Sequence, residues 1–354
     1  MQRIAQAFRR AHAWRDGVLG AAGCLALTLS PAAAQGVEAF YKGRTIDLVV
    51  GYPPGGSNDL YARALANRMG AHLPGNPSIV VRNMPGAGSF LAANHIYTNA
   101  PRDGSVIGIV SPTVAIDEKL GSAGVRFKTA EFGWIGRVNS LVNVIFMWNR
   151  SGVQSMDAAK SIESTLAGTG AGSAVSVYPT VLNNVIGTKF RLVMGYRGSN
   201  EAMLAVERGE AEGHCTGWDT LQSTHADWLA SKSAKVIVQF ALKRHAELPD
   251  VPTALELVTS AQDKQILSAV LNATEVGTSF FTTPGVPRER LEALRTAFDR
   301  TMADPAFLND LKQLKIGISS LRGAELQDLV ASVGDLSPAL TEKLKIAYGS
   351  SASN

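Results

Sequence analysis

A turn rich in proline and glycine, GYPPGGSNDLYARALA at residues 51–66, has the composition of a binding loop for a negatively charged group. Pro53 and Pro54 favour an extended approach, and Gly55 and Gly56 let the backbone turn sharply and come close to a ligand. The next residues are predicted to begin a helix, whose first N–H groups lack intrahelical acceptors and carry the positive end of its dipole. This turn therefore offers recognition of an anion by main-chain N–H groups, without lysine or arginine.

Two later segments repeat this pattern. PGAGS at 85–89 follows the apolar run at 78–82, and GTGAGS at 168–173 precedes a helix-like segment. One glycine-rich turn is equally consistent with a plain connection, but three turns of this kind favour a shared ligand site. None completes the phosphate-loop pattern GxxxxGK[ST], or the pattern GxGxxG with a suitable acidic residue downstream, so nucleotide binding is not predicted.

One cluster of residues has side chains that could take part in catalysis or metal binding. Glu212, His214, Cys215 and Asp219 could hold a metal ion or a nucleophile, since Glu212 and His214 would share one face of a strand. The same residues are consistent with ordinary polar positions at a strand edge, which is the interpretation we favour. The sequence also lacks the GxSxG and HExxH patterns. We therefore predict no catalytic residue, no metal site, no cofactor and no enzyme activity.

Strand-like and helix-like segments alternate along the chain and would position these turns. TIDLVV at 45–50 is apolar and β-branched, as buried parallel strands are. The same pattern recurs at 78–82, 105–110, 142–148, 190–195, 235–241 and 276–282. The clearest helix is predicted at 287–304, where apolar residues recur every three or four positions and Pro305 ends the run. This alternation predicts an α/β fold with mostly parallel sheets, which bind ligands at the carboxyl ends of their strands.

The N-terminus has the layout of a secretory signal peptide over residues 1–34. Four arginines precede an apolar run at 17–30 that is too short to span a membrane, and the run ends in PAAAQG. We predict cleavage after Ala34 and export of the mature chain. A lipoprotein attached through Cys24 is the weaker alternative, because the residues before that cysteine lack the large aliphatic residue usual at such sites.

Composition limits the classes of partner. The chain has 354 residues, enough for two lobes, of which 45% are hydrophobic and 18% are charged. Residues 1–34 hold four arginines and one aspartate, so the formal charge falls from +4 to +1 in the mature chain. This near neutrality argues against nucleic acid or an anionic membrane as a partner. Cys215 is then the single cysteine, which excludes a disulfide within the mature chain.

Six segments resemble, in order, the signatures of one family. They are YPPGGSNDLYARALA, VVRNMPGAGSFLAAN, APRDGSVIGI, YRGSNEAMLAVERGE, ELPDVPTALEL and TPGVPRERLEALRTAFDRTMADPAF. The family is the periplasmic substrate-binding proteins of tripartite tricarboxylate transporters, often called Bug proteins. The resemblance covers nearly the whole mature chain, and the combination is specific although no single segment is.

The resemblance implies a type II periplasmic binding protein with a two-lobed, Venus-flytrap fold, each lobe a mostly parallel sheet flanked by helices. It places lobe 1 at 36–136 plus 266–354 and lobe 2 at 137–265. It implies a periplasmic protein, expected to be a monomer, that captures a small organic anion and delivers it to membrane permease subunits. The implied ligands are a di- or tricarboxylate, an aromatic carboxylate or an acidic amino acid.

The resemblance also implies which residues bind the ligand. In relatives, the first two turns hold one carboxylate through backbone amides and water, and a helix start in lobe 2 takes the other end. The matching residues here are Tyr52, Pro54, Gly55, Gly56, Ser57, Asn58, Ala87, Gly88, Ser89, Ser111, Thr113, Gly170, Ala171, Gly172, Ser173, Tyr196 and Asp219.

This chain departs from the family pattern on the lobe 2 side. Gly195 precedes Tyr196 where relatives often carry proline, Ala174 and Val175 replace frequently polar residues, and residues 214–216 are less apolar than usual. These departures leave the far end of the ligand open and favour an aromatic or longer aliphatic carboxylate. Two alternatives remain: an accessory protein that senses the solute for a membrane histidine kinase, and a secreted hydrolase or isomerase.

Overall fold

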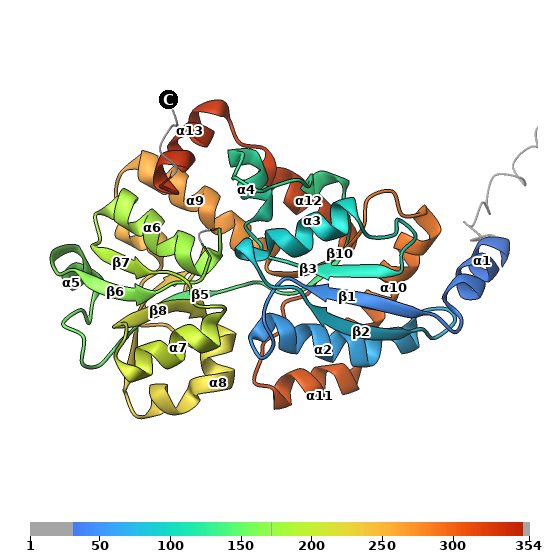
Figure 1. Ribbon diagram of the computed structural model, residues 1–354, viewed down its shortest axis with the longest axis horizontal. Coiled ribbons are helices and arrows are strands. Elements are labelled where there is room, and N and C mark those ends of the chain that lie inside the picture. The colour runs from blue at the N-terminus through green and yellow to red at the C-terminus, as the bar shows by residue number, and fades with distance from the viewer. Residues whose placement is uncertain (1–30, 171, 350–354) are drawn as a thin grey trace, which may run out of the picture.

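We describe the protein from a computed structural model, which covers residues 31–170 and 172–349. Most of the predicted signal peptide, including Cys24, lies outside these residues, and so does Ala171. Two β-sheets lie side by side, each flanked by helices (Figure 1). We name the six-stranded sheet with its helices the first lobe, and the five-stranded sheet with its helices the second lobe.

The strands of the first lobe are β1 (Thr45–Val50), β2 (Ser78–Asn83), β3 (Val106–Ile109), β4 (Gly133–Asn139), β10 (Thr278–Thr282) and β11 (Leu321–Arg322). Their order in the sheet is β11-β4-β10-β3-β1-β2. Strand β1 is parallel to β2 and β3, and β10 is antiparallel to both β3 and β4. Strands β1 to β4 therefore run in one direction, and only β10 and β11 oppose them.

The strands of the second lobe are β5 (Asn143–Trp148), β6 (Ser164–Ala167), β7 (Phe190–Val193), β8 (Gly213–Gly217) and β9 (Ala234–Phe240). Their order is β7-β6-β8-β5-β9, and only β5 opposes the others. Strands β5 and β10 are the first strands after the chain changes lobe. The predicted two-lobed α/β fold with mostly parallel sheets is confirmed.

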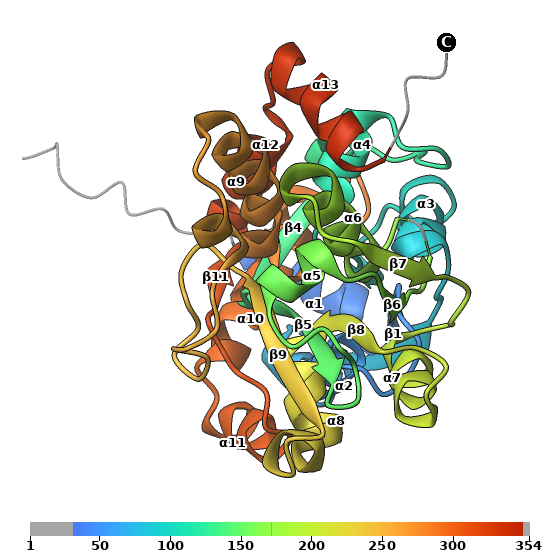
Figure 2. The ribbon, with the colours of Figure 1, turned by 90° about the vertical axis from the view of Figure 1, so that its left-hand side faces the viewer.

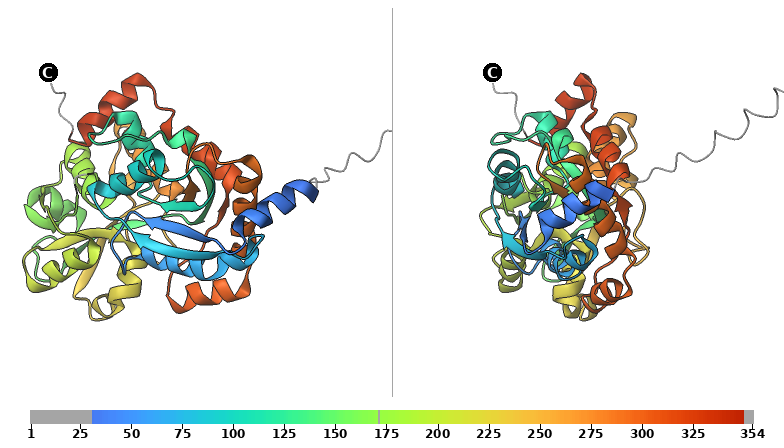
Figure 3. Two further views of the ribbon diagram at one scale, coloured as in Figure 1. Left: turned by 45° about the vertical axis from the view of Figure 1, so that its right-hand side comes forward. Right: turned by 90° about the vertical axis from the view of Figure 1, so that its right-hand side faces the viewer.

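The helical segments of the first lobe are α1 (Pro31–Tyr41), α2 (Ser57–Met69), η1 (Gly70–His72), η2 (Ala87–Ser89), α3 (Phe90–Thr98), α4 (Val114–Leu120), η3 (Thr129–Glu131), α10 (Arg288–Met302), α11 (Pro305–Gln313) and α12 (Gly323–Gly334). Helix α10 buries Leu294, Ala297, Phe298 and Thr301 on one face, which is the spacing that predicted it. Helix α1 packs against α10 at the outer end of this lobe (Figure 3).

The helical segments of the second lobe are α5 (Met156–Ser161), α6 (Ala174–Ile186), α7 (Ser199–Arg208), α8 (Trp218–Ala230) and η4 (Ala254–Leu257). Helix α6 covers one face of the sheet, and α7 and α8 cover the other (Figure 2). Over the described residues, no helix combines the length and the hydropathy needed to cross a membrane.

Two connections and one helix join the lobes. The chain passes from β4 to β5 through residues 140–142, and it returns through α9 (Ala261–Val276) into β10. Helix α13 (Pro338–Ala347) then packs against both α4 and α6, and Asn184 Nδ2 donates a hydrogen bond to the Ala347 carbonyl oxygen at 3.0 Å. An apolar core continues beneath these helices, from Phe281 of β10 to Ile145 of β5. The lobes therefore also share packing outside the cavity.

Candidate functional site

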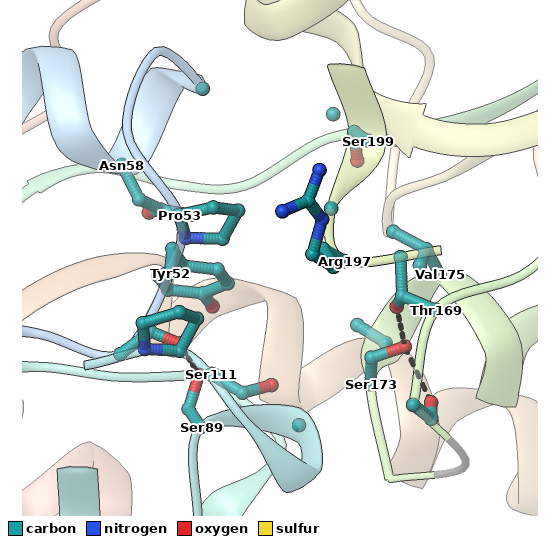
Figure 4. Close-up of a pocket in the computed structure, with 18 of the residues that line it drawn as sticks. Tyr52, Pro53, Asn58, Ser89, Ser111, Thr169, Ser173, Val175, Arg197 and Ser199 are labelled. Atoms are coloured by element: carbon teal, nitrogen blue, oxygen red, sulfur yellow. Dashed lines mark hydrogen bonds between the residues drawn. The ribbon is translucent and has the colours of Figure 1, made fainter. Parts of the chain in front are cut away.

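A cavity of about 520 Å³ lies between the lobes. Its walls come from the turns after β1, β2 and β3 in the first lobe and after β6, β7 and β8 in the second, so the carboxyl ends of six strands face one space. Figure 4 shows Tyr52 and Ser89 on one side, opposite Thr169 and Ser173. The volume suits a small-molecule ligand, and the position is the one that open α/β sheets use for binding.

Most of the residues predicted to bind the ligand line this cavity. They are Tyr52, Pro54, Gly56, Ser57, Asn58, Ala87, Gly88, Ser89, Ser111, Gly170, Ser173 and Tyr196. Gly55, Gly172, Thr113 and Asp219 do not belong to the lining, and Ala171 lies outside the described residues. The structure thus brings the three predicted glycine turns together around one space.

The cavity also uses residues that the sequence did not single out. The turn between β7 and α7 contributes Arg197, Ser199 and Asn200, and Asn143 and Thr220 line the wall on the second lobe as well. Tyr196 of this turn was predicted, and the two glycines between a strand and a helix, as in the three predicted turns, are the signal that would have added its neighbours. The sequence around Asn143 and Thr220 carries no such signal.

The turn between β1 and α2 is held by an ionised carboxylate. The Gly55 N–H donates to Asp59 Oδ2 at 2.9 Å, and Gly55 adopts a φ of 91°, which requires glycine. Burial raises the pKa of Asp59, but hydrogen bonds from Arg63, Asn83 and Gly55 outweigh it and lower the pKa below its usual value. The N–H groups of Gly56 and Asn58, which line the cavity, donate no hydrogen bond within the described part of the chain.

The turn between β2 and α3 has a left-handed backbone at three successive residues. Ala87, Gly88 and Ser89 have φ values of 47°, 65° and 78°. Successive N–H groups in such turns can form a concave site for an anion. Ser89 Oγ donates to the Gly51 carbonyl oxygen at 3.0 Å, which fixes this turn against the preceding one. The two first-lobe turns therefore lie side by side at the cavity.

The turn between β6 and α6 supplies the facing wall. Thr169 Oγ1 and Ser173 Oγ lie 2.6 Å apart, and Ser173 Oγ also donates to the Gly170 carbonyl oxygen at 2.8 Å (Figure 4). The Ser173 hydroxyl is thus directed to its own turn and does not cap α6. The predicted helix start in the second lobe lies in the cavity wall.

Helices that begin at the cavity lack side-chain caps. Helices α2, α3, α6, α7 and α8 all start there, and none has a side-chain N-cap hydrogen bond. Of the helices whose N-cap residues lie outside the lining, α5, α9, α11 and α13 are capped by Ser155, Ser260, Asp304 and Ser337, whereas α4 and α10 are not. Such a cap typically contributes about 1 kcal/mol to stability. The chain thus omits this contribution where the free N–H groups face the cavity.

The lining is nearly neutral. Among the described lining residues, Arg197 is the one charged side chain and no carboxylate is present. Burial raises the pKa of Tyr52 to about 12, although hydrogen bonds with the Ser89 and Ser111 hydroxyls oppose this shift. The phenol therefore stays neutral near pH 7 and can donate a hydrogen bond. An anionic ligand would meet donors here and no like charge.

The lobes touch at several places around the cavity. The Ser57 N–H donates to Thr220 Oγ1 at 3.2 Å, and Thr220 Oγ1 donates to Ser57 Oγ at 2.9 Å. Elsewhere, a Cβ atom added to Gly88 would lie 2.5 Å from the carbonyl carbon of Gly172. Backbone from the two lobes is thus in direct contact, and the structure is a closed form.

Asp219 joins the lobes below the cavity. Its Oδ2 accepts hydrogen bonds from the Tyr61 hydroxyl at 2.9 Å and from Asn139 Nδ2 at 3.0 Å. Burial raises the pKa of Asp219, while the same two hydrogen bonds act in the opposite direction. The side chain that the family pattern placed at the cleft therefore holds α8 against the first lobe.

Thr113 links the cavity wall to a buried carboxyl group. Its Oγ1 lies 2.9 Å from Ser111 Oγ, which lines the cavity, and donates to Asp117 Oδ2 at 2.7 Å. Burial raises the pKa of Asp117 to about 7, despite opposing hydrogen bonds from Thr113 and Ser122. Thr113 thus supports Ser111 from behind the wall.

Asp117→Asn is expected to change how stability depends on pH. Because the folded-state pKa is raised, the folded chain binds more protons than the unfolded chain between about pH 4 and pH 7, so wild-type stability falls as pH rises through that range. The asparagine keeps an acceptor for Thr113 and removes this loss, so the variant should be more stable than wild type at pH 8, by up to about 4 kcal/mol. Urea unfolding at pH 4, 6 and 8 measures the effect.

The control for this prediction is Asp157→Asn. Asp157 lies on α5 with a fully solvated side chain, so its variant should follow the wild-type pH curve. Curves for the Asp117 variant that run parallel to wild type would contradict the raised pKa.

The polar cluster around His214 is buried in the second sheet. His214 Nδ1 lies 2.7 Å from the Ala167 carbonyl oxygen, and burial lowers the pKa of the imidazole to about 4. Burial also raises the pKa of the Cys215 thiol. Neither side chain lines the cavity, and Glu212 instead accepts hydrogen bonds from Thr165 and Ser151. Within the described residues, no three His, Cys, Asp or Glu side chains are placed to hold a metal ion.

Two α/β lobes joined by crossing segments, with strand ends from both facing one cavity, define the class of two-lobed binding proteins. Residues 61–335 match the family described as "Tripartite tricarboxylate transporter family receptor". The chain belongs to this family, whose members are receptors.

Known relatives agree with this assignment. A protein of Pseudomonas sp. strain P51, described as "UPF0065 protein in tcbD-tcbE intergenic region", is 29% identical over 87% of this chain and 88% of its own length. Among solved structures, the periplasmic binding protein BugD has a TM-score of 0.67 at 23% identity, over 87% of this chain and 98% of its own. MatC from Rhodopseudomonas palustris, solved with bound malate, has a TM-score of 0.66 at 20% identity, over 86% and 99%. These two structures support the fold.

Proposed function

We propose that this protein is a periplasmic receptor that binds a small organic carboxylate between its lobes. The main support is that five helices begin at the cavity without side-chain caps. The described residues of the lining also include no carboxylate. A carboxylate there would accept hydrogen bonds from N–H groups that have no other acceptor. Each such charge-assisted bond contributes roughly 1.5–3 kcal/mol. The malate bound to MatC is a ligand of the same chemical class.

The same geometry suggests how binding is coupled to closure. The donors belong to both lobes, so a bound carboxylate reaches all of them only when the lobes are together. Binding then stabilises the closed form through contacts that the open form lacks. We take 36–136 with 266–354 as one moving body and 137–265 as the other. The support for this division is that both crossings between the sheets lie near its boundaries.

Location and partners are inferred from the family and the N-terminus. Arginines followed by a short apolar run support export, and BugD is a periplasmic binding protein. Membership of the receptor family supports delivery of the ligand to the permease subunits of a tripartite transporter. We expect the receptor to act as a monomer and to need no cofactor.

A ligand panel tests this function. Purified mature protein is heated with malate, succinate, adipate, benzoate, terephthalate or glutamate, and each acid is compared with its uncharged amide. At about 100 times its dissociation constant, a true ligand should add about 2.7 kcal/mol to the free energy of unfolding. We expect at least one acid, and none of the amides, to raise the melting temperature. Stabilisation by amides alone, or by no acid of the panel, would contradict the proposal.

A further inference from the structure

The charge of the cavity is concentrated at one residue of the second lobe. Arg197 lies in the turn between β7 and α7, and every other described lining residue is neutral. The first-lobe wall offers N–H and hydroxyl groups, so the two walls differ in what they present to an anion. Figure 4 shows the Arg197 guanidinium directed across the cavity towards Pro53 of the first lobe.

Glu201 pairs with the Arg197 side chain, 88% of which is exposed at the mouth of the cavity. Its Oε2 accepts hydrogen bonds from the Arg197 backbone N–H at 2.7 Å and from Arg197 Nε at 3.2 Å. The two terminal nitrogens, Nη1 and Nη2, make no hydrogen bond with any residue that the structure describes. They form the edge of the guanidinium that can bind a carboxylate through two parallel hydrogen bonds.

The turn that carries Arg197 also meets the first lobe. Gly198 packs against the Pro53 ring so closely that no Cβ atom would fit between them. Closure therefore brings Arg197 up to the first-lobe turns. Leu141, Ala174 and Val175 give other parts of the lining an apolar surface.

We propose that Arg197 is a specificity-determining residue that selects ligands with a second negatively charged group. One carboxylate binds the N–H groups of the first-lobe turns, and the second binds the guanidinium edge of Arg197. A ligand with one carboxylate leaves Arg197 without a partner, so the receptor discriminates by charge at the far end of the ligand. This inference rests on the proposed carboxylate binding.

Matched acid pairs test the inference by titration calorimetry. The pairs are succinate with butyrate, adipate with hexanoate, and terephthalate with benzoate, each measured with wild type, Arg197→Gln and Arg191→Gln. Arg191 is an exposed arginine of β7 that pairs with Glu163 outside the cavity lining, which makes it the control. We expect Arg197→Gln to weaken the preferred diacid at least about tenfold, to leave its monoacid within about twofold, and to make diacid binding less sensitive to salt.

The outcomes separate the two proposals. If the monoacid binds wild type as tightly as its diacid, or if Arg197→Gln weakens both equally, the role of Arg197 is wrong while carboxylate binding stands. The same conclusion follows if Arg191→Gln has the same effect as Arg197→Gln. If wild type binds no acid of any pair, the proposed function fails, and the inference about Arg197 fails with it.

Discussion

Replacing Gly88 with valine is expected to lower ligand affinity at least about 100-fold, which corresponds to about 2.8 kcal/mol. Gly88 has a φ of 65°, which β-branched residues avoid. Its added side chain would also overlap the Gly172 backbone of the second lobe, because even a Cβ atom would lie 2.5 Å from the carbonyl carbon. Valine therefore distorts the anion-binding turn and keeps the lobes apart. Titration calorimetry with the acid found in the ligand panel measures the loss.

Gly121→Val is the control that separates the cost of a strained backbone from the overlap between the lobes. Gly121 follows α4 with φ 67° and ψ 36°, close to the 65° and 33° of Gly88, but no atom lies within 4 Å of its added Cβ. The control variant should carry a similar backbone cost, about 1–2 kcal/mol of stability, and bind the ligand as wild type does. Wild-type affinity in Gly88→Val would show that this contact between lobes has no part in binding.

Gly56→Pro is the second variant with a large expected effect. Gly56 lines the cavity, and its N–H has no acceptor among the described residues, so we expect it to bind the ligand. Its φ of −83° is close to the range that proline requires, so proline removes the donor with little change in the backbone. Loss of one charge-assisted hydrogen bond should weaken binding about tenfold to a hundredfold. Affinity from calorimetry and stability from urea unfolding are measured together.

Gly56→Ala is the matched control for this variant. It keeps the N–H, the φ is negative, and no atom lies within 4 Å of the added Cβ. The alanine variant should therefore bind as wild type does. Equal affinities for the proline and alanine variants would mean that this N–H does not contact the ligand.

Segments with strong local patterns were predicted well. TIDLVV forms β1 at the predicted residues, and α10 occupies most of the predicted 287–304. Strands β4 and β6 were not predicted, because their sequences lack a continuous apolar run. In β4, Gly136 packs directly under the Phe298 ring, and Arg137 is buried by hydrogen bonds to distant carbonyl groups. Such tertiary contacts outweigh local propensity.

The sequence predicted those parts of the candidate site that are formed by glycine-rich turns. Glycine between a strand and a helix identified three turns, and all three line the cavity. The sequence did not reveal which polar side chains would face the ligand. Asp219 points to Tyr61, and Thr113 points to Asp117, because the way the lobes and helices meet decides these contacts. Arg197 was missed for the same reason, since helical and strand periodicity say nothing about a side chain in a turn.

The last helix limits how this receptor can move. Because α13 contacts α4 and α6 and is fixed by Asn184 at its carboxyl end, it bridges the two lobes, and we expect this tether to persist while the cleft opens. Sliding or twisting of one lobe past the other would break this tether, whereas a simple rotation about the crossing segments would preserve it. We therefore expect solute to enter and leave through the cleft between the strand ends.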